Sequence, residues 1–154
     1  MNNYKLELLE KGVVAFIPRG NSMWPTLKDR GQTVILIKKT ERLKRFDVGF
    51  FVRPNGQYVL HRVIQVTEKG YVFQGDGQDF TETALEEDVI AYMEGFYRGK
   101  RYVEANNSKY LKEVERLYSN DKKRIKRVNC YLKRKAFINR IRHFLRLKVK
   151  KVVE

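Results

Sequence analysis

The sequence predicts a mainly β protein, with an antiparallel β body over residues 1–104 and a basic α-helical extension over residues 105–154. Runs rich in Val, Ile, Phe and Tyr fill most of the first part, and turn residues separate them. In the second part the apolar residues recur every three or four positions, which is the period of an α-helix. Basic residues are concentrated at the end of the chain. These three observations define the fold class.

The β body is expected to begin with a short helix or turn that ends near Gly12. About six strands are expected to follow, at residues 13–18, 33–38, 47–54, 57–67, 71–76 and 89–98. Asn55-Gly56 joins the third and fourth of these runs and is a strong signal for a two-residue hairpin. Lys69-Gly70 is expected to form the next turn.

Two helices are expected in the extension. The apolar face of the first is formed by Tyr110, Leu111, Val114, Leu117 and Tyr118, and Asn107 or Ser108 can cap its start. The second repeats Ile138, Ile141, Leu145, Val149 and Val152 at spacings of three or four residues. Because Lys and Arg fill much of its remaining surface, it is predicted to be a basic amphipathic helix.

Composition excludes several classes of protein. A chain of 154 residues suits one domain with an appendage. The single cysteine, Cys130, excludes an intramolecular disulfide framework, and with only two histidines we expect no metal site and no cofactor. No run reaches about 18 consecutive apolar residues, and the first residues are too charged for a signal peptide. The protein is therefore expected in the cytoplasm, soluble or peripheral to the inner face of the membrane.

The net charge of +15 lies almost entirely in the last part of the chain. Residues 1–120 carry 19 Lys and Arg against 16 Asp and Glu, whereas residues 121–154 carry 14 against 2. A helix of this composition can lie on an anionic membrane, with Phe137, Ile141, Phe144 and Leu145 in the interface. The alternatives are a nucleic-acid phosphate backbone or an acidic protein partner. Nucleic acid is the less favoured, because the chain contains no groove-reading or RNA-binding motif.

Candidate chemistry begins with Ser22, which lies in the sequence PRGNSMWPTL at residues 18–27. A nucleophilic serine needs a base within hydrogen-bond reach and a group that orients the base. The body contains one histidine, His61, which on a two-residue period shares a strand face with Val59 and Val63. Apolar neighbours keep an imidazole neutral, and a neutral imidazole can act as a base. From spacing alone, the pattern favours a structural role for each of these residues over a catalytic one.

Three blocks together resemble the signal peptidase I and LexA-like serine peptidase superfamily. GNSMWPTL is similar to the box that holds the nucleophile, HRVI to the strand that carries the general base, and GDGQ to the Gly-Asp-Asn box. Most members have lysine at the second site. Histidine there resembles the endoplasmic-reticulum-type branch. The similarity covers about residues 13–98 and implies a β-sheet peptidase, here without the transmembrane anchor or the DNA-binding head of its relatives.

The resemblance implies a role for each matching residue. Ser22 would attack the scissile carbonyl, and His61 would accept its proton and later donate it to the leaving amine. The oxyanion would be held by the backbone N–H of Ser22, with Gly20 leaving room beside it. The remaining residues of the box are expected to shape it or the substrate groove: Met23, Trp24 and Pro25. Trp24 can equally be a core residue, a groove wall or a membrane-interface anchor.

The third catalytic residue would be a carboxylate that orients His61, and its candidates are acidic residues that follow His61 in the sequence. The third block reads Gly75-Asp76-Gly77-Gln78, so the usual asparagine is missing. Asp76 is the first choice to orient His61 and Asp79 the second. Glu82 is a further candidate for the more distal acidic position of the histidine branch.

The leading hypothesis is a serine endopeptidase that cleaves an extended segment of a precursor protein or leader peptide. By resemblance, small side chains would be favoured before the cut. The alternative is a non-catalytic peptidase-like module that binds peptide, anionic membrane or nucleic acid through its basic tail. A third reading is a regulator related to phage-repressor peptidases. Retention of Ser22 and His61 favours the enzyme, and the altered Gly-Asp-Gly-Gln block favours the module.

Overall fold

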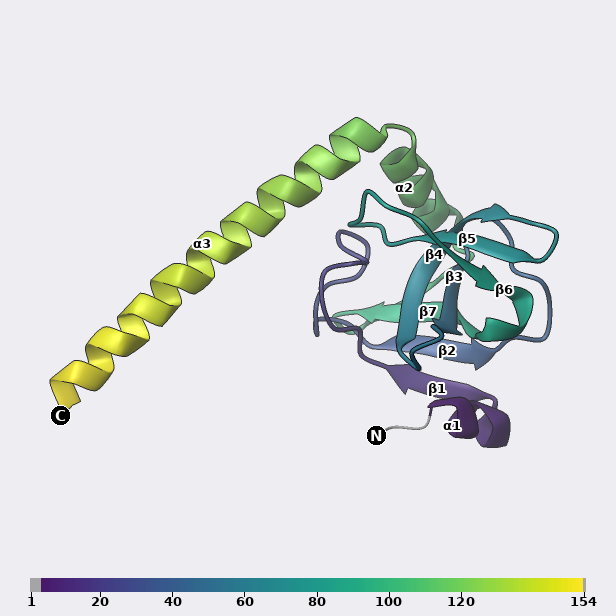
Figure 1. Ribbon diagram of the computed structural model, residues 1–154, viewed down its shortest axis with the longest axis horizontal. Coiled ribbons are helices and arrows are strands. Elements are labelled where there is room, and N and C mark those ends of the chain that lie inside the picture. The colour runs from purple at the N-terminus through teal and green to yellow at the C-terminus, as the bar shows by residue number, and fades with distance from the viewer. Residues whose placement is uncertain (1–3, 154) are drawn as a thin grey trace.

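The β-rich runs form one eight-stranded sheet in which every strand pair is antiparallel. The sheet makes up most of the body of the molecule in Figure 1. The computed structural model describes residues 4–153, with side chains up to residue 144. The strands are β1 Val13–Phe16, β2 Val34–Lys38, β3 Val48–Val52, β4 Tyr58–Val66, β5 Gly70–Gln74, β6 Glu82–Leu85, β7 Val89–Arg98 and β8 Arg101–Glu104. The helices are α1 Tyr4–Lys11, α2 Ser108–Tyr118 and α3 Asp121–Val153, and a short 3-10 helix, η1, spans Glu86–Asp88.

All six expected strands are confirmed, and two short strands were not predicted. These are β6 and β8, of four residues each. The sequence of β6, ETAL, contains residues that are uncommon in strands, and half of its side chains are exposed. It is a strand because β5 supplies backbone partners along its whole length. Such pairing comes from the tertiary fold and is invisible in a local pattern.

The hairpin between β3 and β4 is longer than predicted. The Arg53 N–H donates to the Gln57 carbonyl at 2.9 Å, and the Gly56 N–H donates to the Arg53 carbonyl at 2.8 Å. A two-residue type I′ turn needs positive φ at both central residues. Here Gly56 has φ +79° and Asn55 does not have a positive φ. The connection is therefore a three-residue loop in which only the glycine takes the left-handed conformation.

The sheet has the strand order β1-β2-β7-β3-β4-β5-β6. Strand β8 pairs with residues 95–98 of β7, beyond the part of β7 that pairs with β3. The central strands bury both faces. In β3, Phe50 belongs to the main core, whereas its neighbour Phe51 belongs to a second cluster on the opposite face with Val63 and Phe73. Because side chains alternate along a strand, adjacent residues of β4 also face different environments. This alternation determines which acidic side chains lie on the same face of the sheet as His61.

Helix α2 forms part of the same core as the sheet. Its Tyr110 and Val114 are buried in the main cluster, and the Asn107 side chain caps its start by accepting from the N–H groups of Lys109 and Tyr110. The apolar face and the cap predicted for this helix are confirmed. The division expected at residue 104/105 falls between β8 and a helix that shares the core of the β body.

Helix α3 begins on the body and then runs away from it, as Figure 1 shows. Arg124 and Val128, near its start, are buried. The side chains from Leu132 onward are largely exposed up to residue 144, the last whose side chain is described. Among the described helices, none combines the length and the apolar content needed to cross a membrane.

Candidate functional site

The loop between β1 and β2 carries Ser22 on a turn held from both sides. The Trp24 N–H donates to the Asn21 carbonyl at 3.0 Å, and the Leu27 N–H donates to the Met23 carbonyl at 2.8 Å. Met23 and Leu27 are buried in the main core, so Met23 anchors the loop and does not line a groove as expected. Ser22 itself is half-buried at the tip of this anchored turn.

The Ser22 loop packs directly on the Gly75-Asp76-Gly77-Gln78 turn. The Gly77 N–H donates to the Ser22 carbonyl at 2.7 Å. A Cβ added at Gly75 would lie 2.5 Å from the Ser22 carbonyl oxygen, and one at Gly77 would lie 2.5 Å from the Asn21 carbonyl oxygen. Both distances are shorter than any side chain tolerates, so the two glycines permit this backbone contact. The first and third blocks of the predicted site are therefore in contact.

His61 lies on β4 with its side chain in the second cluster. Its ring centroid is 6.3 Å from that of Phe51, and the residue is only 3% exposed. Val59 and Val63, predicted to share its face, belong to the same cluster as Phe51. Burial lowers the pKa of His61 below its ordinary 6.5, although the nearby carboxylate of Glu82 acts in the opposite direction. The folded protein therefore favours the neutral imidazole.

The carboxylate that meets His61 is Glu82. Glu82 Oε1 lies 2.5 Å from His61 Nδ1, in a close contact without the linear geometry of an N–H···O hydrogen bond. Arg53 holds the same carboxylate with both ends of its guanidinium, at 2.8 Å from Nε to Oε2 and 3.0 Å from Nη2 to Oε1. Burial alone would raise the pKa of Glu82, but Arg53 and His61 lower it below its ordinary value. Glu82 is thus a fixed anion beside the imidazole.

Asp76, the first choice for this role, has a different partner. It is fully buried and accepts from Arg62 Nε and Nη2 at 2.7 Å each, and from the Tyr118 hydroxyl at 2.8 Å. The Thr26 hydroxyl also bonds to it. Asp79, the second choice, is exposed on the turn. The structure therefore places neither aspartate against His61 and corrects both choices for the orienting group.

Strand alternation explains this correction. The register pairs Arg62 with Gln74, Val63 with Phe73, and Phe73 with Glu82. Directly paired residues share a face, so Glu82 lies on the face of Phe73, Val63 and His61. Arg62 and Asp76 occupy the other face, beside Tyr110 of α2. The sequence did not single out Glu82 because β6 was not predicted, and only the pairing of β6 with β5 places Glu82 on the same face as His61.

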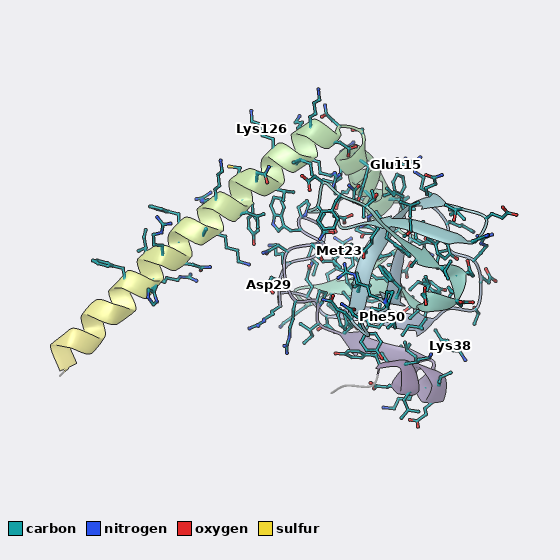
Figure 2. All side chains as sticks on the ribbon, in the orientation of Figure 1. Met23, Asp29, Lys38, Phe50, Glu115 and Lys126 are labelled. Carbon is teal, nitrogen blue, oxygen red and sulfur yellow. The ribbon has the colours of Figure 1, made fainter. Side chains whose placement is uncertain are left out.

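Helix α3 holds both loops of the site, which the sequence did not indicate. Arg124 is buried and its Nη1 donates to the carbonyls of Asp76 at 3.0 Å and Gln78 at 2.8 Å. Lys135 donates to Asn21 Oδ1 at 2.9 Å and pairs with Asp29 at 3.1 Å. Asp29 in turn accepts from the Gly20 N–H at 2.9 Å. Figure 2 shows Asp29 on the side of the body that faces α3.

Trp24 stacks on a ring of α3, a contact that is not among the three roles expected from the sequence. Its ring lies 4.3 Å from that of Tyr131, with an interplanar angle of 9°. It is therefore a contact residue between the Ser22 loop and the C-terminal helix. Pro25, the next residue, lines a cavity of about 600 Å³ with residues of α2 and α3. A second cavity of about 820 Å³ lies between α3 and the turn at Asp79, and neither cavity is lined by Ser22 or His61.

Ser22 and His61 are not hydrogen-bonded in this structure, judged over the residues that it describes. Within the same range the Ser22 N–H has no acceptor, so it is free to donate to a bound group, whereas the Gly20 N–H already donates to Asp29. No group of three or more His, Cys, Asp or Glu side chains that could hold a metal gathers in the described part of the chain. The titratable and nucleophilic groups of the candidate site are the Ser22 hydroxyl, the buried imidazole of His61 and the Glu82 carboxylate.

Comparison of the sequence with models of protein families and with characterised proteins yields no match. The fold and the residues define the protein as a mainly antiparallel β structure with a C-terminal helix. Its candidate site combines a buried His61–Glu82 pair with a Ser22 loop packed against the neighbouring strand end.

We expect His61 to titrate below pH 6.5 in the folded protein. The imidazole resonances can be followed by NMR, with a His143→Gln variant to assign them. The unfolded chain takes up this proton near its ordinary pKa, whereas the folded chain takes it up at lower pH. The contribution of His61 to stability is therefore complete above pH 6.5 and decreases as the pH falls towards the folded-state pKa. A midpoint above 6.5 would contradict the burial argument.

We expect Tyr131→Ala to shift the emission of Trp24 to longer wavelength, because removal of the stacked ring exposes the indole. Trp24 is the only tryptophan, so the signal reports this contact alone. The expected loss of unfolding free energy is about 0.5–1.5 kcal/mol beyond the change in buried area. Tyr97→Ala is a matched control, since Tyr97 packs on Tyr102 instead. Unchanged emission in Tyr131→Ala would show that the stack does not form in solution.

Proposed function

We propose that the protein is a serine endopeptidase similar to signal peptidase I and the LexA-like peptidases, with His61 as its base. Its proposed substrate is an extended segment of a precursor protein or leader peptide. The observation that supports this most strongly is the Glu82 carboxylate against Nδ1 of a buried imidazole. The imidazole lies on β4, which pairs with β5, and the turn that follows β5 contacts the Ser22 loop. A serine, a histidine and an orienting carboxylate are the parts that acyl transfer to serine requires.

In the proposed mechanism Nδ1 of His61 faces Glu82, which leaves Nε2 to accept the Ser22 proton. Ser22 Oγ forms a bond to the scissile carbonyl carbon, and the oxyanion accepts from the Ser22 N–H. The C–N bond then breaks, and the proton on Nε2 passes to the leaving amine. Water then attacks the carbonyl carbon of the acyl-enzyme while Nε2 accepts its proton. The bond to Ser22 Oγ breaks, and the proton passes to Oγ, which releases the acid product and restores Ser22.

Substrate binding is expected to bring Ser22 and His61 into hydrogen-bond contact. Catalytic hydrogen bonds in unliganded enzymes are often long and tighten only with substrate bound. The end strand β1 leads directly into the Ser22 loop, and it is paired with a strand only on its β2 side in the described sheet. An extended peptide can add to such an edge and place its carbonyl near Ser22.

The test is cleavage of a library of unstructured peptides, with new termini read by mass spectrometry. Wild type is expected to make cuts that Ser22→Ala and His61→Ala lose. Ser119→Ala and His143→Ala are matched controls, because both residues are exposed and far from the site in sequence. Cuts that persist in Ser22→Ala would assign the activity to a contaminant and contradict the proposal.

The second candidate is a non-catalytic module that binds peptide. The observation that favours it is the 3% exposure of His61, together with the lack of a hydrogen bond to Ser22 among the described residues. Its distinguishing result in the same experiment is peptide retention without any Ser22-dependent cut. Retention can be measured by fluorescence polarisation with the peptides that mass spectrometry leaves intact.

A further inference from the structure

The outer part of α3 presents a row of large apolar side chains to solvent. Phe137 is 62% exposed, Ile138 40%, Ile141 43% and Phe144 57%. Their spacing places them on one side of the helix, and we call these four residues the outer face. Figure 2 shows this part of α3 projecting beyond the β body. Large apolar side chains that are exposed together are typical of binding surfaces, so the outer face has the character of one.

The charge around the outer face has a single sign. Residues 122–153 contain 14 Lys and Arg and no Asp or Glu. Arg134, Arg140 and Arg142 are exposed on the same part of the helix. A second copy of α3 would place like charges against like charges, which disfavours self-association through this helix. The partner must therefore be anionic and must also cover apolar side chains.

A phosphate backbone meets only the first of these two requirements. Nucleic acid neutralises the Lys and Arg side chains but leaves Phe137 and Ile141 in water, because readout of phosphates needs no apolar stripe. The surface of an anionic bilayer meets both. Its headgroups pair with the basic residues, and its acyl boundary accepts the apolar side of a helix that lies in the interface. We propose that the outer face of α3 binds an anionic lipid bilayer.

The inner part of α3 gives this binding a consequence for the site. Tyr131 stacks on Trp24, and Lys135 bonds to Asn21 and Asp29 within two turns of Phe137. If α3 is bound at the bilayer, these contacts therefore place the Ser22 loop close to the bilayer surface. This second step rests on the proposed peptidase function, whereas lipid binding itself does not.

The test uses the full-length protein and point variants. Deletion of residues 121–154 would remove the buried Arg124 and Val128 and disturb the body. Co-sedimentation is measured with vesicles of phosphatidylcholine alone and with phosphatidylglycerol added. We expect binding only to the anionic vesicles, weaker at high salt, with at least about a tenfold loss of affinity in Phe137→Gln/Ile141→Gln. Leu9→Gln, at a 59% exposed apolar residue of α1, is the matched control.

The outcomes of this test distinguish lipid binding by the outer face from phosphate binding and from catalysis. Equal affinity of Phe137→Gln/Ile141→Gln and wild type for anionic vesicles, or equal binding to both kinds of vesicle, would overturn the proposal. A short DNA duplex is included as a competitor. If it displaces the vesicles and binds the double variant as well as wild type, the surface is a phosphate-binding one and the proposal fails. Ser22→Ala is expected to bind lipid like wild type, so a failure of catalysis leaves this result intact.

Discussion

Asp76→Asn is expected to lower the free energy of unfolding by about 3–5 kcal/mol, because it leaves a buried guanidinium without a counter-charge. Arg62 and Asp76 are both fully buried and joined by two bonds of 2.7 Å. Burial alone would lower the pKa of Arg62, but the Asp76 carboxylate raises it well above its ordinary value, so the guanidinium stays charged. The loss is comparable with the whole stability of many domains, which is about 5–15 kcal/mol. Chemical denaturation measures it.

Two further variants keep this prediction testable if Asp76→Asn does not fold. Asp79→Asn changes an exposed carboxylate on the same turn and is expected to stay within about 0.5 kcal/mol of wild type. Replacing both charges, in Arg62→Met/Asp76→Leu, is expected to recover much of the loss, since apolar pairs often substitute for buried ion pairs. A stable Asp76→Asn that had lost only peptide cleavage would instead return Asp76 to the catalytic role inferred from the sequence.

Glu82→Gln is expected to reduce kcat about 10²–10⁴-fold if the protein is a peptidase, because the amide no longer stabilises the imidazolium that forms during attack. Glu82 acts through His61, so it is a positioning residue. Glu82→Asp keeps the charge and is expected to recover part of the rate. Steady-state kinetics on a peptide from the library test measures both variants. A Glu82→Gln rate equal to wild type would remove Glu82 from the proposed mechanism.

The pKa of His61 separates this role from a merely structural one. Glu82 raises that pKa and Arg53 lowers it, so the two substitutions have opposite effects. Glu82→Gln is expected to move the imidazole titration, and the acid limb of the rate profile, to lower pH. Arg53→Gln is expected to move both to higher pH. Shifts of the same sign in the two variants would contradict the charge arrangement described for the site.

The sheet was largely predictable because its long strands carry their signal locally. Runs such as QYVLHRVIQV are rich in β-branched and aromatic residues, and all six such runs became strands. The short strand β6 carries no such signal, since its pairing depends on the position of β5. The three-residue loop at Gly56 depends likewise on the register of β3 and β4 and not on the Asn-Gly pair alone.

The sequence predicted which turn and strand carry the candidate site residues, but it did not predict which side chains those residues contact. The positions of Ser22 and His61 in turn and strand agree with the sequence analysis. The choice among Asp76, Asp79 and Glu82 needed the parity of residues across two strand pairs, and a register shift within the β4–β5 pair prevents counting from the sequence. The contacts of Arg124 and Lys135 span more than forty residues of chain, so no local pattern encodes them.

The bonds from α3 to the two loops also set an order of events during biosynthesis. The chain is synthesised from its N-terminus, so its N-terminal residues emerge from the ribosome first. The sheet and the Ser22 loop are made well before Arg124, Tyr131 and Lys135, which later bond to the Gly75–Gln78 turn, Trp24 and Asn21. While the chain is still growing, these loops lack their C-terminal supports. The nascent chain therefore passes through a stage in which all residues of the sheet have been synthesised and the residues that support its candidate site have not.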